Sequence, residues 1–538
     1  MKRKGIMLLA LLAGLCFGGL FLSGNADAAS KIKIDKKHFP GKAFREYVRK
    51  FDKNKDGYLS KKERKAVRRI ELESGKGPCS FAITLRYLPK INLKGIGYFT
   101  QTEELKILDY KVENLKFATL KNLKMVDINM TSIKGNDGKA VEKYDFTENK
   151  KLREISLHWI GGSVKQILLA SDNEVKKLAL KPTSNMNKLD LSHFSQVEEL
   201  IIERGETLES IDLGKCALLK KADISYNKKL TSLDFSGNPN LEKLTAYNNH
   251  LTSLDISKNR KLKYLMVDYN YLTKLNVSQN VELREIECSH NLLETLDIST
   301  LKKLRTLHCY CLKLKELNLT ENLELEQLGC DGNQLETLDL SANTRLLGVS
   351  CNANRLETLD LSVNTKLLDV NCGANPLEKL DVSMLPKLTG LSCDYARLTA
   401  LDVSNNRKLD SLTYAGNRIP FVDLTGHSVR ISNSEAVAKM QKSQLLPPVD
   451  GSLEEGIPID KEHFPDYALR YEVLADFDSN HDGILSEKES LIKRPLNLTE
   501  YGSASRREID CTGMEYLKGI TEVISGSDTT LLNNTYKK

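Results

Sequence analysis

The sequence contains none of the short motifs that carry common enzyme chemistry. It has no nucleophile elbow, no zinc-binding helix, no phosphate-binding loop and no C-x-x-C, although it holds 11 cysteines and 9 histidines. It also lacks a nucleic-acid recognition motif, and its net charge of +7 is modest for 538 residues. These absences predict a protein that is not an enzyme and does not bind nucleic acid.

Only the N-terminal end carries an apolar run close to the length that spans a membrane. Three basic residues, Lys2 to Lys4, precede the apolar run 5–22, and residues 26–28 read A-D-A, a cleavage signal. Residues 1–29 are therefore predicted to be a signal peptide cleaved near Ala28, which makes the mature chain secreted or displayed at the cell surface. The alternative is an uncleaved membrane anchor, because the run is almost long enough to span a bilayer.

A repeat of 21 residues organises the middle of the chain. Nine consecutive units cover residues 230–418 in the form L-x-x-L-D-φ-S-x-N-x-x-L-x-x-L-x-C-x-x-N-x, where φ is apolar. A unit this short cannot bury its apolar side alone, so stacked copies must share one core. Residues 105–229 keep the leucine pattern more loosely. We predict a single solenoid over residues 105–425, with a lead-in at residues 71–104.

This unit resembles the leucine-rich repeats of bacteria, in particular the nested class called IRREKO, whose unit holds two similar halves. Here the halves are LETLDLSAN and LLGVSCNAN, and both are expected to run as strands. The resemblance implies a β-rich leucine-rich-repeat solenoid that binds other molecules, and it supplies no catalytic residues.

Several columns of polar residues and cysteine recur at the same period. Two asparagine columns are predicted to bond backbone groups of the turns, and irregular coils are expected where both fail, at Leu301 and Leu312 and at Leu385 and Ala396. An outward aspartate column is expected to make local turn bonds, with a cation-binding stripe as the alternative. Six cysteines take an inward position and are predicted to be buried thiols, with disulfides or a metal column as alternatives: Cys288, Cys309, Cys330, Cys351, Cys372 and Cys393.

Residues 52–63, DKNKDGYLSKKE, match the calcium-binding loop of an EF-hand. Carboxylate, amide, hydroxyl and carbonyl oxygens stand at the loop positions that calcium requires, and Gly57 permits the sharp turn. The predicted Ca2+ ligands are Asp52, Asn54, Asp56, the Tyr58 carbonyl, Ser60 and Glu63. A metal-free acidic turn is the alternative. Residues 30–70 form this module, and its many Lys and Arg side chains are either a solvated surface or a patch that holds anionic cell-wall polymers.

The same module returns near the C-terminus. Residues 426–456 lose the repeat and are predicted to be a linker, residues 457–495 form a second EF-hand module, and residues 496–538 form a tail that resembles a truncated solenoid lead-in. In that tail, Leu517–Ile520 is expected to correspond to Leu93–Ile96. The second set of predicted Ca2+ ligands is Asp478, Asn480, Asp482, the Ile484 carbonyl, Ser486 and Glu489.

The repeated phrases H-F-P and F-D-x-N-x-D-G-x-L-S-x-x-E, together with the repeat unit, resemble proteins of Gram-positive bacteria that combine EF-hands with leucine-rich repeats and are exported. That resemblance implies surface display. The predicted fold is thus a leucine-rich-repeat solenoid with small α-helical EF-hand modules at both ends.

Outward positions of the cysteine-bearing half-unit vary along the solenoid, from aromatic to small and polar. Exposed aromatic and sulfur-containing side chains on a rigid face favour contact with a protein or glycan. The predicted ligand-binding residues are Tyr247, Tyr264, Met266, His308 and Tyr310. The predicted function is therefore that of an exported calcium-binding protein that binds a protein or glycan at the bacterial cell surface, with calcium ordering the two flanking modules. The alternative is a structural envelope protein without a dedicated ligand.

Overall fold

The computed structural model describes residues 31–74, 88–129, 132–134, 143–158, 166–182 and 186–419, and, with gaps, residues between 422 and 532. The predicted signal peptide, most of the predicted linker and three ligands of the second calcium loop lie outside the described residues. Among the described helices, none is long and apolar enough to cross a bilayer.

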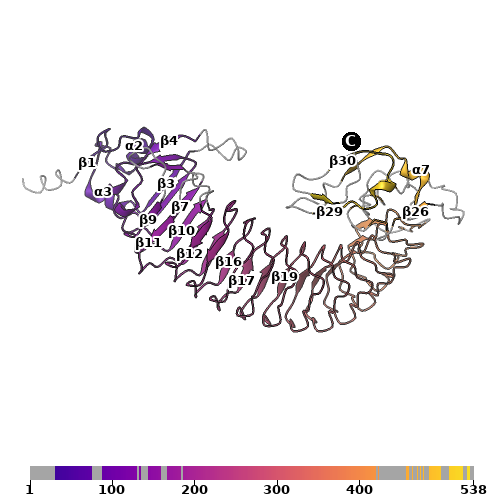
Figure 1. The fold of residues 1–538 in the computed structure, drawn as a ribbon. Helices are drawn as coiled ribbons and strands as arrows, with labels where there is room; N and C mark the ends of the chain where they lie inside the picture. The colour runs from indigo at the N-terminus through magenta and orange to yellow at the C-terminus, as the bar shows by residue number, and fades with distance from the viewer. Residues whose placement is uncertain are drawn as a thin grey trace, which may run out of the picture.

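One parallel sheet of 16 strands runs along the whole solenoid, which Figure 1 shows as a curved stack of coils. It begins with longer strands and continues with three-residue strands from β16 onward. Its strands are β3 (Arg69–Glu73), β5 (Glu104–Leu108), β7 (Met125–Asn129), β10 (Glu154–His158), β12 (Lys177–Leu180), β14 (Glu199–Ile202), β16 (Lys221–Asp223), β17 (Lys243–Thr245), β18 (Tyr264–Met266), β19 (Glu285–Glu287), β20 (Thr306–His308), β21 (Gln327–Gly329), β22 (Gly348–Ser350), β23 (Asp369–Asn371), β24 (Gly390–Ser392) and β25 (Ser411–Thr413). The looser region 105–229 therefore belongs to the same solenoid, as predicted.

The opposite side of the solenoid carries strands only in its first part. The described strands there are β4 (Lys90–Asn92), β6 (Lys111–Glu113), β8 (Ser132–Lys134), β9 (Lys143–Phe146), β11 (Gln166–Leu169), β13 (Lys188–Asp190) and β15 (Ser210–Asp212). In the nine regular units, this side contains a single isolated bridge, between Asp234 and Asp255. The expectation of two strands per unit is therefore wrong. The first half-unit forms a turn instead, in which the serine backbone N–H donates to the aspartate side chain, for example Ser236 N–H to Asp234 Oδ1.

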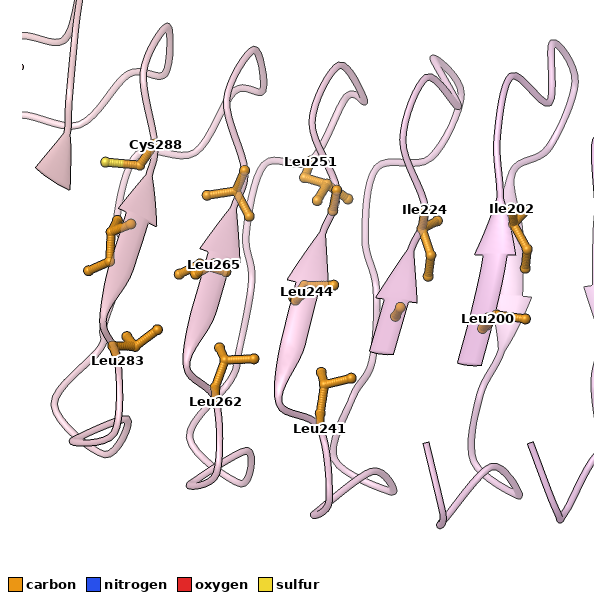
Figure 2. Packing of buried hydrophobic residues seen from close by; sticks show 14 of the residues in the cluster. Leu200, Ile202, Ile224, Leu241, Leu244, Leu251, Leu262, Leu265, Leu283 and Cys288 are labelled. Carbon is orange, nitrogen blue, oxygen red and sulfur yellow. The ribbon is translucent and has the colours of Figure 1, made fainter. Parts of the chain in front are cut away.

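Leucine rows fill the interior because the side chains on either side of each outward residue point inward. Leu241, Leu262 and Leu283 form one row through neighbouring coils and Leu244 and Leu265 another (Figure 2). The cysteine column continues a third row, and all six thiols are buried and free, which confirms their prediction as packed side chains. Burial raises the pKa of the Cys288 thiol well above its usual value, so the thiolate needed for metal binding or disulfide exchange is disfavoured.

Buried asparagines connect one coil to the next, as predicted. The Asn291 side chain donates to the carbonyls of Val267 (3.0 Å) and Cys288 (2.9 Å), and its Oδ1 accepts the Leu272 N–H (3.0 Å). These groups are left open by the strands, which are too short to bond them. Asn280, in the second column, likewise donates to carbonyls of the preceding coil.

The predicted irregularity is wrong at Leu301, Leu312 and Leu385, where the backbone bonds are regular. Leu301 N–H donates to Ile298 O (2.9 Å) and Leu304 N–H to Leu301 O (3.1 Å), the same turn that Asn280 makes in its own coil. The turn closes through backbone groups, and a buried leucine fills the asparagine position without disturbing them.

The coil at Ala396 is irregular, as predicted. Ala396 offers no side-chain oxygen to the Leu377 N–H, which donates to Asn375 O instead, and Glu378 and Arg397 adopt φ values of 55° and 57°. Pro376 also lacks the N–H that the equivalent Arg355 donates to Leu335 O.

The N-terminal module shares the core of the solenoid. It consists of β1 (Ile32–Lys33), α2 (Lys42–Val48), the 3-10 turn η1 (Arg49–Phe51), β2 (Tyr58–Leu59) and α3 (Lys61–Ala66), with β1 and β2 paired antiparallel. Phe39, Phe44 and Val48 are fully buried in the same cluster as the leucine rows. Both helices are short, and α3 leads directly into β3. The module therefore closes the first coil of the solenoid.

The C-terminal module has its own core and repeats the first module together with the first coil. Its described elements are β26 (Gly456–Pro458), β27 (Ile484–Ser486), α7 (Glu487–Ser490), β28 (Arg494–Asn497), β29 (Glu508–Asp510), η4 (Met514–Tyr516), β30 (Ile520–Ile524) and β31 (Thr530–Leu532). Gly513 (φ 101°) precedes η4 as Gly95 (φ 100°) precedes the 3-10 turn η2 (Ile96–Tyr98), and each glycine lies against a buried phenylalanine.

This match corrects the expected register of the tail: Cys511 corresponds to Leu93, and Leu517 corresponds to Phe99. In the second module the structure describes α7 and, before the loop, the helical residues Leu469 and Val473, whose neighbours lie outside the described residues.

We predict that Asn291→Ala lowers the free energy of unfolding by about 2–4 kcal/mol, because it leaves buried carbonyls and one buried N–H without partners. The measurement is denaturant unfolding of the full chain. The control is Asn240→Ala, whose side chain makes two exposed hydrogen bonds, donating to the Ala217 carbonyl (3.0 Å) and accepting from Lys261 Nζ (2.7 Å). This variant should change stability by less than about 0.5 kcal/mol. Equal losses for both variants would contradict the structural role of the column.

Candidate functional site

The predicted ligand-binding residues all lie on what we call the sheet face, the solvent side of β16–β25 together with the outward residue two positions beyond each strand. Strand register places Tyr264 beside Glu285, and it places Met266 beside Glu287, which in turn lies beside His308. Tyr247 and Tyr310 follow β17 and β20. All five predicted residues are partly exposed, as a contact surface requires.

Aromatic rings on this face form pairs, some between neighbouring coils and one within a coil. Tyr247 packs edge-on against Tyr226 at 4.8 Å between ring centroids, whereas His308 and Tyr310 stack at 5.4 Å. A third pair, Tyr269 and His290, stacks at 4.2 Å. The structure therefore places the aromatic side chains in separate ring pairs. The predicted ligand-binding residues do not include Tyr226, because this residue precedes the regular repeats.

Three carboxyl groups on the sheet face were not predicted as site residues. Asp268, Asp331 and Asp394 are separated by three repeat units each, and all are largely buried. Burial, followed by the nearby Glu287 carboxylate, raises the pKa of Asp268 to about 6. Burial also raises the pKa of Asp331 and Asp394. Their regular spacing in the sequence was the signal that could have found them.

These carboxyls belong to a ladder of short polar side chains. Each oxygen accepts the backbone N–H of the equivalent residue in the next coil: Asp268 from Ser289 (2.7 Å), Ser289 from Tyr310 (3.0 Å), Asp331 from Asn352 (2.6 Å), Asn352 from Gly373 (2.7 Å) and Asp394 from Ala415 (2.6 Å). The ladder fixes the backbone beyond each strand, where the sheet bonds have ended. The outward side chains are consequently held in place before any ligand arrives.

Glu287 and His308 form the ion pair nearest to the aromatic stack. His308 Nδ1 lies 3.8 Å from Glu287 Oε1. A hydrogen bond to His308 lowers the pKa of Glu287, and the same contact raises the pKa of His308. Each member of the pair therefore favours the charged form of the other.

The first calcium loop has the backbone shape that its sequence predicts. Asp52 Oδ2 accepts the Gly57 N–H (2.9 Å), and Gly57 has a φ of 79°. Glu63 reaches back across the loop, with Oε1 accepting the Lys53 N–H (2.7 Å) and Oε2 the Ser60 N–H (2.9 Å). The carboxylates at loop positions one and twelve thus accept backbone N–H groups of the loop. The residues present fit a calcium ion in their donor types and turn geometry.

Two observations qualify that fit. Lys31 Nζ lies 2.9 Å from Asp56 Oδ2, so a cationic side chain already accompanies one predicted ligand. Within the described ranges, no three His, Cys, Asp or Glu side chains are grouped as a metal site. In the second loop, Ser486 and Glu489 form the same capping box as Ser60 and Glu63, while Asp478, Asn480 and Asp482 lie outside the described residues.

Comparison with known proteins identifies the fold. Neither a protein-family model nor a curated protein matches the chain. Among solved structures, the functional domain of InlJ from Listeria monocytogenes, which includes a cysteine ladder, is 26% identical, with 70% of this chain and 78% of that chain covered and a TM-score of 0.57. The internalin InlF of the same species is 17% identical over 68% of this chain and 98% of that chain, with a TM-score of 0.47. The likeness to InlJ supports a leucine-rich-repeat solenoid.

We expect Asp268→Asn to stabilise the chain at pH 7, by up to about 3 kcal/mol, because the amide avoids burying a charge. The pKa of this carboxyl is higher in the folded than in the unfolded state, so the gain should vanish as the pH falls from about 6 to about 4 and the native carboxyl takes up its proton. Thermal and denaturant unfolding at several pH values measure this difference.

The matched control is Asp255→Asn. Hydrogen bonds from Ser257 lower the pKa of that exposed carboxyl, so this variant should show no gain at pH 7. A gain of equal size at both positions would mean that general charge effects, and not burial, set the result.

Proposed function

We propose that this chain is an exported leucine-rich-repeat protein that binds a protein partner through its sheet face. The observation that carries the proposal is the arrangement of the face itself: partly exposed aromatic side chains stand on 16 hydrogen-bonded strands in fixed register. Tyrosine and methionine contribute much contact area and little conformational entropy on binding, which is typical of protein interfaces.

The surface favours a protein partner over a small molecule. Its aromatic pairs are spread across several coils, from Tyr226 and Tyr247 to His308 and Tyr310. A small ligand is normally enclosed in a concave pocket, whereas a partner of protein size can span such separated pairs. A glycan is the other ligand class that aromatic faces suit, and it is an outcome of the test.

The test is capture of partners from extracellular protein by the immobilised full chain. Replacing Tyr247, Tyr264 and Tyr310 by alanine should lower the captured amount about tenfold or more, because several large contacts are removed at once. The control triple is Leu323→Ala, Val363→Ala and Met384→Ala, which removes equally apolar side chains that are 57%, 44% and 53% exposed outside the sheet face.

Partner capture that survives the tyrosine changes and fails in the control triple would place the interface elsewhere. Capture that resists protease digestion of the extract and is lost after glycosidase treatment would identify a glycan as the ligand.

We propose further that the module at residues 30–70 binds one calcium ion, and that the second module binds another. Asp52, Asn54, Asp56, Ser60 and Glu63 would supply side-chain oxygens, with the Tyr58 carbonyl as a further ligand. Since Phe39, Phe44 and Val48 are buried in the solenoid core, calcium in this loop would stabilise the first coil as well as the module. Attachment of the basic module to anionic cell-wall polymers stays a prediction.

Calcium should raise the unfolding temperature of the full chain and protect the peptide bonds of residues 52–63 from proteolysis.

Glu63→Gln should weaken the calcium affinity about tenfold or more, because it removes a bidentate carboxylate. Glu46→Gln, an exposed change of the same charge in α2, should leave the affinity within about twofold. Isothermal titration calorimetry measures both, and calcium binding unaffected by Glu63→Gln would exclude this loop as the site.

A further inference from the structure

Charge is distributed unevenly along the sheet face. From β18 to β25, the face consists of three rows of eight outward positions, beginning at Tyr264, Met266 and Asp268 and repeating every 21 residues. None of these positions holds Lys or Arg, although the whole chain has a net charge of +7. Six of them hold carboxyl groups: Asp268, Glu285, Glu287, Asp331, Asp369 and Asp394.

The same side of the sheet is different on the strands before β16, which lie outside the sheet face. Outward positions there mix both signs, as with Lys177 between Glu154 and Glu199, which it approaches to 3.8 and 3.3 Å. Among the described residues, Glu287 is the only one of the six later carboxylates that has an ion pair, and its partner is His308. A negative surface without Lys or Arg in these rows is complementary to a positively charged partner.

Tyr310 provides a flat aromatic surface in the middle of this region. Its ring stacks on His308 and lies across Gly329, where any Cβ atom would overlap it. The backbone N–H of Tyr310 donates a hydrogen bond to the Ser289 hydroxyl at 3.0 Å. The side chains of Gln327 and Asp369 likewise lie across Gly348 and Gly390 of the next strand. Because these glycines have no side chains, the outward residues of the later strands lie close to the backbone of the neighbouring strand.

We infer that the part of the sheet face from β18 to β25 binds an arginine-rich segment of the partner protein, with Tyr310 as the stacking surface. The inference rests on the proposed protein-binding function and specifies the chemistry of its partner. A guanidinium group is planar, so it can stack on Tyr310 while its N–H groups donate to neighbouring carboxylates such as Glu287 and Asp331.

Binding of such a segment should weaken at acidic pH. The groups that face His308 are Glu287 and Glu285 of β19, Asp268 beyond β18 and the stacked Tyr310, while β21 presents Gly329. As the pH falls through about 6, Asp268 loses its negative charge, which disfavours a cation. The contact with Glu287 raises the pKa of His308, so this ring carries a positive charge at acidic pH and disfavours a cation as well.

The experiment measures the affinity of the full chain for a fluorescein-labelled arginine–serine peptide by fluorescence anisotropy, with a glutamate–serine peptide as the negative probe. The test variant combines Glu285→Gln, Glu287→Gln and Asp369→Asn, which leaves the hydrogen-bonded ladder intact. We expect its affinity to fall roughly tenfold, since three surface charge pairs are lost.

The matched control combines Asp339→Asn, Asp360→Asn and Asp381→Asn. These exposed aspartates make local turn bonds outside the sheet face, and the same column already contains Asn276 and Asn318 in that role. This variant changes the net charge equally and should bind the peptide within about twofold of the parent chain. Thermal unfolding confirms that both triples fold.

Equal losses in the two triples, or an affinity for the arginine–serine peptide no greater than for the glutamate–serine peptide, would overturn the inference. The proposed function would survive that result if tyrosine-dependent capture of a protein persisted. Capture that fails while the peptide still binds in the predicted pattern would instead overturn the protein-partner proposal alone.

Discussion

The structure depends on hydrogen bonds that the buried asparagines make between consecutive coils. Strands from β16 to β25 are only three residues long, so strand pairing alone leaves many interior carbonyls and N–H groups without partners. Asn291 bonds the carbonyls of Val267 and Cys288 and accepts from Leu272, and equivalent asparagines repeat this arrangement along the column. Leucine rows supply the apolar contacts, while the asparagines keep the polar backbone satisfied within them.

A rigid interior has consequences for the surface. Because each coil is held in register with the next, outward residues separated by 21 positions lie next to one another, and their spacing hardly changes along the solenoid. The carboxylate ladder adds a second constraint beyond the strand ends, through bonds such as Asp331 to the Asn352 N–H. Side chains on the sheet face are therefore preorganised, which lowers the entropy lost when a partner binds.

The N-terminal module closes the first coil of the stack. Phe39 and Phe44 complete the core over the first coil, and the capping box of Ser60 and Glu63 begins the helix that leads into β3. The C-terminal module repeats this construction with Phe464 in place of Phe39 and with its own core. Placing a metal-binding loop within a cap would couple the stability of the solenoid end to the ions outside the cell.

The sequence by itself determined the solenoid, its inward leucines and cysteines, and the region where aromatic residues gather, because a strict period dictates which positions repeat on each side. Tertiary structure decided what the period does not encode. It gave one strand per regular unit and a regular turn at Leu301, since backbone bonds close that turn whether or not an asparagine is present. It also brought together Asp268, Glu287, His308 and Tyr310, which lie on three different coils. Contacts of that kind depend on the lateral distance between coils and on side-chain conformation, and neither can be read from the spacing of residues along a chain.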